Sequence, residues 1–341
     1  MTKLDELLGC IEHPHVYILM HNYPDQDALA SALGLQALFQ AKGKHATIIY
    51  HGIIDKVNTL KMLELLAIKI FPLQDVSLEP EDEIIIVDGQ KGNINMAETN
   101  GLVIACIDHH QLQNTACYRF HDIRSDVGAC SSIITSYFLE NNIPITSDLA
   151  TALLYGIKID TANLTRGVSH LDLTVFSHLY HCSNSIKLRS LEKNSIQLSD
   201  LISYKKAIEN LETFGSLAIV NIGNDCSEAM IATVNDFLFT ISEIEFTLVY
   251  SYRGGGIKFS TRSALPSVDA SDIMKTILAG FGDGGGHSNM AAGFIPNVPT
   301  EEEAMQLVEI ITSRTVSYIN KCIPSNIVVH KLTELNDYSK V

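Results

Sequence analysis

Three short apolar runs constrain the fold of this chain most, because each ends on a side chain that can bind a metal ion. The runs and the residues that follow them are 16–20 with His21, 84–87 with Asp88, and 102–107 with Asp108. Continuous apolar runs of this length are typical of buried parallel strands. Ligands of open α/β sheets bind at the carboxyl ends of such strands. The sequence therefore predicts an α/β fold with metal-binding residues along one edge of a parallel sheet.

The chain is long enough for two domains, because its 341 residues exceed the usual size of a single hydrophobic core. Residues 1–185 alternate strand-like and helix-like segments, which predicts a doubly wound parallel sheet. Residues 186–213 are polar and indicate a helical connector. Residues 214–341 predict a smaller α/β domain with a mixed sheet.

Apolar periodicity predicts further elements in both halves. In the first half we expect a strand at 46–50 and helices at 28–39, 57–66, 128–141, 147–159 and 171–180. In the second half we expect strands at 217–222, 245–252, 257–262 and 291–295, and helices at 269–279 and 301–318. The three glycines at 254–256 indicate a hairpin turn between two of these strands.

Charge and cysteine content limit the partners of the chain. Lys and Arg number 24 against 39 Asp and Glu, so the net charge is −15. That charge disfavours a long nucleic acid, whose affinity comes largely from phosphate neutralisation, although a bound cation can still attract a short nucleotide. Seven cysteines without a Cys-x-x-Cys pair, and no apolar stretch of membrane-spanning length, predict a cytoplasmic protein without membrane contact.

The segment after the first apolar run carries two carboxylates, Asp25 and Asp27. Pro24 turns the chain out of the strand, so both carboxylates lie in a strand-to-helix loop. Two carboxylates this close repel each other unless a cation lies between or beside them. An Asp that caps the helix, with its neighbour in solvent, explains the same pattern equally well.

The remaining candidate ligands differ in how strongly they indicate a metal. Asp88 could simply end a buried strand. The triplet Asp108-His109-His110 is harder to explain without a ligand, because a metal-bound histidine usually needs a carboxylate or carbonyl at its other ring nitrogen. Asp160 ends a helix-like stretch, where the helix dipole disfavours an anion unless a cation lies nearby.

A glycine run in the second half is a candidate anion site. Gly284, Gly285 and Gly286 stand directly before His287. Glycine allows close approach of the backbone, so successive N–H groups of the run could form a concave site for a phosphate. A flexible loop tip is the alternative interpretation.

The strand at 256–263 has one polar face. Strand alternation places Lys258, Ser260 and Arg262 on the same side, opposite two apolar residues. This pattern alone favours a solvated sheet surface, with a substrate-binding face as the alternative.

The candidate ligands follow one another in an order that resembles the signature motifs of the DHH phosphoesterases. The matching positions are His21, Asp25, Asp27, Asp88, Asp108, His109, His110 and Asp160. Residues 281–294 resemble the glycine-rich motif of the DHH-associated domain. The resemblance spans residues 16–294 and implies a catalytic domain, a substrate-binding domain and an active site in the cleft between them.

The resemblance implies six ligands for two divalent cations, which in this family are usually manganese. His21 and Asp25 would hold one ion, Asp27, His109 and Asp160 the other, and Asp88 would bridge both. The donor chemistry agrees, because imidazole and carboxylate without thiolate suit Mn²⁺, Fe²⁺ or Co²⁺. Asp108 would orient a histidine, and His110 would bind the phosphate of the substrate.

For the substrate, the resemblance favours a contact from Arg262, because family members carry an Arg-Ser pair near this place. Ser260, on the same strand face, and the glycine run with His287 complete the expected binding residues. Two departures from the family pattern leave the substrate open: Asp283 interrupts the glycine motif, and residues 162–164 replace the usual Gly-x-Phe.

We therefore expect a Mn²⁺-dependent phosphodiesterase, similar to the nanoRNase and pAp-phosphatase branch of the family. Its expected substrates are short nucleotides such as pGpG, pApA, nanoRNA or pAp, and the protein could form a homodimer. A c-di-AMP phosphodiesterase and a RecJ-like exonuclease are alternatives. A family II pyrophosphatase resembles the first half of the chain, but its second half lacks a Gly-Gly-Gly-His motif of this kind. A catalytically silent nucleotide sensor is the alternative from another class.

Overall fold

The computed structural model describes residues 1–341 except 55, 94, 113–117, 194–195, 323–328 and 332–341. The chain divides into two compact units, Met1–Ser195 and Ile196–Val341. The division falls within the segment expected to connect the domains. Its helix Ser185–Glu192 belongs to the first unit and its helix Leu201–Glu209 to the second.

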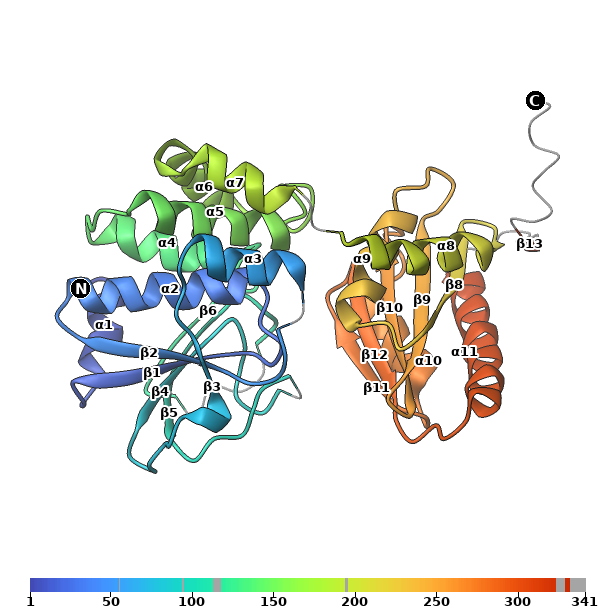
Figure 1. The fold of residues 1–341 in the computed structure, drawn as a ribbon, viewed down its shortest axis with the longest axis horizontal. Helices are drawn as coiled ribbons and strands as arrows, with labels where there is room; N and C mark the ends of the chain where they lie inside the picture. The colour runs from blue at the N-terminus through green and yellow to red at the C-terminus, as the bar shows by residue number, and fades with distance from the viewer. Residues whose placement is uncertain (55, 94, 113–117, 194–195, 323–328, 332–341) are drawn as a thin grey trace. The chain divides into compact units, whose positions relative to one another are not determined.

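The first unit alternates strands and helices (Figure 1). Its strands are β1 (His15–Met20), β2 (His45–Tyr50), β3 (Phe71–Pro72), β4 (Glu83–Val87), β5 (Leu102–Asp108) and β6 (Phe120–Ile123). Its helices are α1 (Lys3–Gly9), α2 (Gln26–Ala41), α3 (Val57–Leu65), α4 (Cys130–Glu140), α5 (Ser147–Asp160), α6 (His170–Cys182) and α7 (Ser185–Glu192). The predicted strands and helices of this half are all present, whereas α1, β3 and β6 were not anticipated.

The six strands form one parallel sheet in the order β3-β2-β1-β4-β5-β6. The chain moves outward from the centre in both directions, as expected for a doubly wound sheet. The central strands are paired nearly in step, since Met20 pairs with Val87 and Val87 with Ile107. The residues that follow these strands therefore emerge side by side at one edge.

The two faces of this sheet are covered differently. One face packs against the helices in a large core that includes Leu29, Phe39, Ile134 and Leu153. A smaller cluster around Ile86 on the other face is covered by side chains of connecting segments. Figure 1 shows α2 to α7 gathered on one side of the sheet.

The second unit has a seven-stranded mixed sheet in the order β11-β12-β10-β9-β8-β7-β13. Its strands are β7 (Glu212–Phe214), β8 (Leu217–Asn224), β9 (Phe246–Arg253), β10 (Gly256–Ser263), β11 (Asp283–Gly286), β12 (Met290–Ile295) and β13 (Val329–Lys331). Its helices are α8 (Leu201–Glu209), α9 (Glu228–Leu238), α10 (Ala270–Leu278) and α11 (Glu301–Cys322). Among the described strands of this unit, β8 and β9 are the one pair that runs parallel.

Helices cover both faces of this sheet. One core contains residues of α10 and α11, such as Ile273 and Ile311, and the other contains residues of α9, such as Val234. The predicted hairpin joins β9 to β10 through Gly254 and Gly255, whose φ angles of 60° and 71° fit the left-handed positions of a tight hairpin turn. Among the described residues, no helix combines the length and hydropathy needed to cross a membrane.

Candidate metal centre

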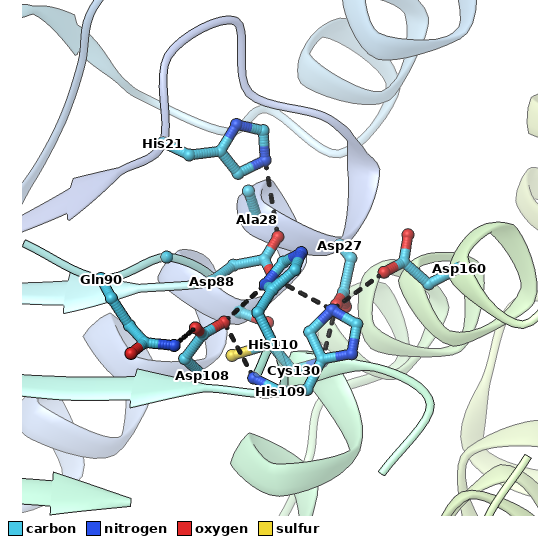
Figure 2. Close-up of polar contacts among 12 residues, drawn as sticks. His21, Asp27, Ala28, Asp88, Gln90, Asp108, His109, His110, Cys130 and Asp160 are labelled. Carbon is cyan, nitrogen blue, oxygen red and sulfur yellow. Dashed lines mark hydrogen bonds and ion pairs between the residues drawn. The ribbon is translucent and has the colours of Figure 1, made fainter. Parts of the chain in front are cut away.

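The predicted ligands meet at the carboxyl edge of the first sheet (Figure 2). His21 follows β1, Asp88 follows β4, and His109 follows β5. Asp25 is the residue before α2, and it accepts hydrogen bonds from the N–H groups of Asp27 and Ala28. It is therefore the helix cap that the plainer interpretation expected, and it also lies beside His21.

The distances divide the ligands into two groups that share Asp88. His21 Nε2 lies 3.6 Å from Asp88 Oδ2 and 3.8 Å from Asp25 Oδ1. His109 Nε2 lies 3.4 Å from Asp88 Oδ1 and 3.2 Å from Asp160 Oδ2. Ligand atoms about 2.0–2.2 Å from one metal ion stand roughly this far apart. Each group thus has the spacing of donors around one cation.

Asp27 completes the second group. One ligand atom each from Asp27, His109 and Asp160 lie within 4.8 Å of one another, as do atoms from His21, Asp25 and Asp88. All six side chains that the sequence nominated as ligands are therefore in the cluster.

The imidazoles are oriented for coordination through Nε2. His21 Nδ1 lies 2.8 Å from the carbonyl oxygen of Asn22, and His109 Nδ1 lies 3.2 Å from that of Val127. A carbonyl accepts only from a protonated nitrogen, so each Nδ1 carries a proton and each Nε2 faces the carboxylates, where it can bind a cation once it has lost its own proton. Asp88 Oδ1 is buried and accepts no hydrogen bond from the described residues. These donors fit a pair of divalent cations.

The surrounding charges shift the pKa values of these groups in opposite directions. Burial by itself lowers the pKa of His21, but Asp25 and Asp88 outweigh it and raise that pKa well above 6.5. Burial likewise opposes protonation of His109, and Asp160 with Asp88 raises its pKa well above 6.5. Burial would raise the pKa of Asp88, but the two histidines hold it well below 3.8. Without metal, protons on the histidines compensate the buried carboxylates.

Asp27 is held by the start of α4. It is fully buried, and its two oxygens accept hydrogen bonds from the N–H groups of Cys130 at 2.7 Å and Ser131 at 2.9 Å. Gly156 of α5 leaves room for this contact, because a Cβ there would lie 2.5 Å from Ser131 Oγ and 2.9 Å from Asp27 Oδ1. Sequence analysis missed these supports, since each joins segments far apart in the chain.

Asp108 connects the remaining histidine to the cluster. It is fully buried, and His110 Nδ1 donates to its Oδ1 at 2.8 Å. Gln90, a second buried residue that sequence analysis missed, donates to Oδ2 at 2.7 Å (Figure 2). The ring of His110 is thereby fixed at Nδ1, and its side chain keeps 39% of its surface exposed.

A pocket of about 170 Å³ opens beside the cluster. Its lining residues are His21, Asp25, Asp88, Gly89, Asn93, Asn95, Met96, His110 and Asp160. The segment that follows Asp88, residues of both cation groups and the predicted His110 therefore all line the same pocket.

In the second unit, Ser260 and Arg262 are buried rather than solvated, so the plain interpretation of this strand face is wrong. Arg262 Nε donates to Asp236 Oδ1 at 2.7 Å, and its Nη1 donates to Ser260 Oγ at 3.1 Å. Asn235 of α9 donates to the same hydroxyl at 3.1 Å. The polar face lies beneath α9, an element with no counterpart among the predicted helices. The role of Arg262 in substrate binding stays a prediction.

The glycine run is part of a strand and not the flexible loop tip that was the alternative interpretation. Gly284, Gly285 and Gly286 belong to β11, an edge strand that pairs with β12. Small residues are required here because a Cβ on Gly284 would lie 2.9 Å from the carbonyl oxygen of Ala292. His287 follows the strand, and its N–H donates to the carbonyl of Met290 at 2.7 Å. Substrate binding by these residues also stays a prediction.

Comparison with known families agrees with this geometry. Residues 15–157 match the DHH family, N-terminal domain, and residues 215–315 match the DHHA1 domain. The first match contains five of the six clustered ligands, and the second contains β11 and Arg262. The chain belongs to the DHH family and carries a C-terminal DHHA1 domain.

Three relatives extend the comparison. The chain is 31% identical to the uncharacterized protein MJ1633 of Methanocaldococcus jannaschii, over 86% of this chain and 61% of that protein. It is 26% identical to the cyclic-di-AMP phosphodiesterase GdpP of Geobacillus thermodenitrificans, over 90% of this chain and 48% of that protein. It is also 26% identical to a probable manganese-dependent inorganic pyrophosphatase of Streptococcus thermophilus, over 71% of this chain and 79% of that protein. The chain spans 61% and 48% of the first two relatives.

A solved structure shares the fold. The crystal structure of an exopolyphosphatase-related protein from Bacteroides fragilis matches with a TM-score of 0.74 and 18% identity, over 93% of this chain and 97% of that protein. At this identity the similarity shows a shared fold and does not by itself show a shared chemistry.

Proposed function

We propose that this protein is a divalent-metal-dependent phosphodiesterase that hydrolyses short nucleotides. The observation that carries the proposal is the pair of donor groups that share Asp88, with His110 at the adjoining pocket. Bound at these groups, two cations would supply Lewis acidity toward a water molecule and toward the phosphoryl oxygens. Carboxylates and imidazoles suit Mn²⁺, and a relative that matches 71% of this chain is named as a probable manganese-dependent inorganic pyrophosphatase.

The chain's own residues supply orientation and a proton donor. Asp108 accepts a hydrogen bond from the Nδ1–H group of His110 and thereby fixes the plane of the ring. Burial by itself lowers the pKa of His110, but Asp108 outweighs it and raises that pKa above 6.5. A ring that keeps its Nε2 proton can donate a hydrogen bond to a phosphoryl oxygen or to the departing sugar oxygen.

The proposed substrates are linear dinucleotides such as pApA or pGpG, with nanoRNA and pAp as further members of the class. The net charge of −15 disfavours a long polyanion. The match to the cyclic-di-AMP phosphodiesterase covers 90% of the chain and includes the second unit, which favours c-di-AMP as the second candidate. The match to the pyrophosphatase covers less of this chain, 71%. For substrate contacts we propose Ser260, Arg262, His287 and the glycines of β11.

A turnover panel tests the proposal. It contains pApA, pGpG, pAp, c-di-AMP, pyrophosphate and oligoribonucleotides, each with Mn²⁺ and each with EDTA. We expect Mn²⁺-dependent release of mononucleotides from the dinucleotides. Hydrolysis of pyrophosphate alone would replace the proposal by a pyrophosphatase, and nucleotide binding without turnover would replace it by a sensor. Asp148→Ala is a suitable control, because Asp148 lies at the surface and pairs with Lys187.

A further inference from the structure

One short segment that leads into the first turn of α4 holds two of the three donors of the second cation group. We call residues 127–131 the clamp segment. The carbonyl oxygen of Val127 lies 3.2 Å from His109 Nδ1. The N–H groups of Cys130 and Ser131 donate to the two oxygens of Asp27. A displacement of the clamp segment would therefore move His109 and Asp27 together.

The clamp segment is itself held by Asp172, a fully buried residue in the first turn of α6. The N–H of Gly128 donates to Asp172 Oδ2 at 2.8 Å, and Ser132 Oγ donates to Oδ1 at 2.5 Å. The bond to Gly128 thus holds the clamp segment near its start, and the bond to Ser132 holds the residue directly after its end. Because their partners are separated by 44 and 40 positions in the chain, local sequence gives no sign of them.

Capping of α6 explains only part of this arrangement. Ser169 and Asp172 form a reciprocal capping box: the N–H of Asp172 donates to Ser169 Oγ, and the N–H of Ser169 donates to Asp172 Oδ2. Ser169 Oγ also donates to Asp172 Oδ2. The bonds to Gly128 and Ser132 are additional. Gly128 is fitted to them, because a Cβ there would lie 2.8 Å from the carbonyl oxygen of Gly167 and 3.0 Å from Asp172 Oδ2.

We propose that Asp172 is a positioning residue for the second cation: it fixes the clamp segment, which in turn orients His109 and Asp27. The inference rests on the metal centre of the proposed function. It assigns to α6, which contributes no ligand, control over the affinity of one of the two cation groups. Changes at residues that orient metal ligands typically weaken metal binding by about 10–100-fold.

Three variants separate this role from helix capping. Asp172→Ala removes both clamp bonds and the cap, whereas Ser169→Ala removes the hydroxyl of the cap and leaves Gly128 and Ser132 bonded. Asp172→Asn is the conservative variant, because its amide oxygen can accept from Gly128 and its NH₂ can donate to Ser132 Oγ. Mn²⁺ binding to the full chain is measured by calorimetry and electron paramagnetic resonance, with circular dichroism as the check on folding.

We expect wild type to bind two Mn²⁺ ions. Asp172→Ala should weaken the binding of one Mn²⁺ ion about 10–100-fold. The affinity for the other ion should stay within about threefold of the wild-type value. Ser169→Ala and Asp172→Asn should keep both affinities within about threefold. A folded Asp172→Ala protein with two wild-type affinities would overturn the inference, as would Ser169→Ala weakening Mn²⁺ as strongly as Asp172→Ala.

If Asp172→Ala does not fold, Ser132→Ala serves instead, because it removes only the bond to Oδ1. It should lower the affinity for the same one of the two Mn²⁺ ions several-fold, and an unchanged affinity would contradict the inference. A wild-type protein that binds no Mn²⁺ would overturn the metal centre itself and this inference with it. Failure of the proposed function and failure of the role of Asp172 are thereby distinguished.

Discussion

Asp88 is the residue on which both cation groups depend. Its φ of 57° lies in the left-handed region, which costs a residue other than glycine about 1–2 kcal/mol. Its N–H donates to the carbonyl of Ile107 at 2.9 Å and holds this conformation against β5. One carboxylate oxygen faces His21 and the other faces His109. The strained backbone therefore coincides with the position from which one side chain serves both groups.

Asp88→Ala should lower kcat/KM by at least about a hundredfold on every substrate, because it removes a donor from both groups at once. The variant should remain folded, since the large hydrophobic core of the first unit does not include this side chain. Steady-state kinetics at saturating Mn²⁺ checks the first expectation and circular dichroism the second. Activity within about threefold of wild type would contradict the shared role.

Gly156→Ala should damage the site without touching a predicted ligand. The new Cβ would meet Ser131 Oγ and Asp27 Oδ1, so we expect a loss of about 1–3 kcal/mol in the free energy of unfolding and weaker Mn²⁺ binding. Gly9→Ala is the matched control, because a Cβ at Gly9 meets no atom within 4 Å. Denaturant unfolding and Mn²⁺ titration compare the two, and equal Mn²⁺ affinities would refute the packing argument.

At the scale of elements, the strands that consist of continuous apolar runs were predictable from the sequence. A strand that forms only because it pairs with a neighbouring strand was not. The runs of β1, β4 and β5 are recognisable because both faces of a central parallel strand are buried. β11 has glycines where strands usually carry branched side chains, and it becomes a strand by pairing with β12. α9 covers the polar face of β10, which strand alternation alone made look solvated.

The burial of Arg262 beneath α9 leads to a prediction for that strand. Arg262→Ala should lower the free energy of unfolding by about 1.5–3 kcal/mol, because it leaves the hydrogen bonds to Asp236 and Ser260 unmade. If the residue also contacts substrate, KM for dinucleotides rises while kcat changes little. Reduced stability with an unchanged KM would make its role purely structural. Arg253→Ala, at the end of β9, is the control.

At the scale of the whole molecule, the buried histidines and carboxylates make stability depend on pH and metal together. The pKa values of His21 and His109 are raised in the folded state, so their contribution is fully present below about pH 6.5. It is lost as the pH rises through the folded-state values. The lowered pKa of Asp88 contributes stability that is fully present above about pH 3.8 and is lost as the pH falls below that value.

We therefore expect the EDTA-treated protein to become less stable as the pH rises from about 6 to about 9. Bound Mn²⁺ replaces the lost protons, so the difference in denaturation midpoint between the Mn²⁺ and EDTA forms should widen over the same range. Denaturant titrations at several pH values measure both trends. Parallel curves for the two forms would contradict the buried-proton account.

The sequence by itself determined the order of elements in the first unit and the identity of the clustered side chains. It could do so because strand ends and ligand types are local features. Only the tertiary structure decided what surrounds them: Gln90 on Asp108, the start of α4 on Asp27, and Asp172 behind the clamp segment. It also decided that Arg262 lies under a helix. Such contacts join residues distant in the chain, and their energies depend on burial that no local pattern records.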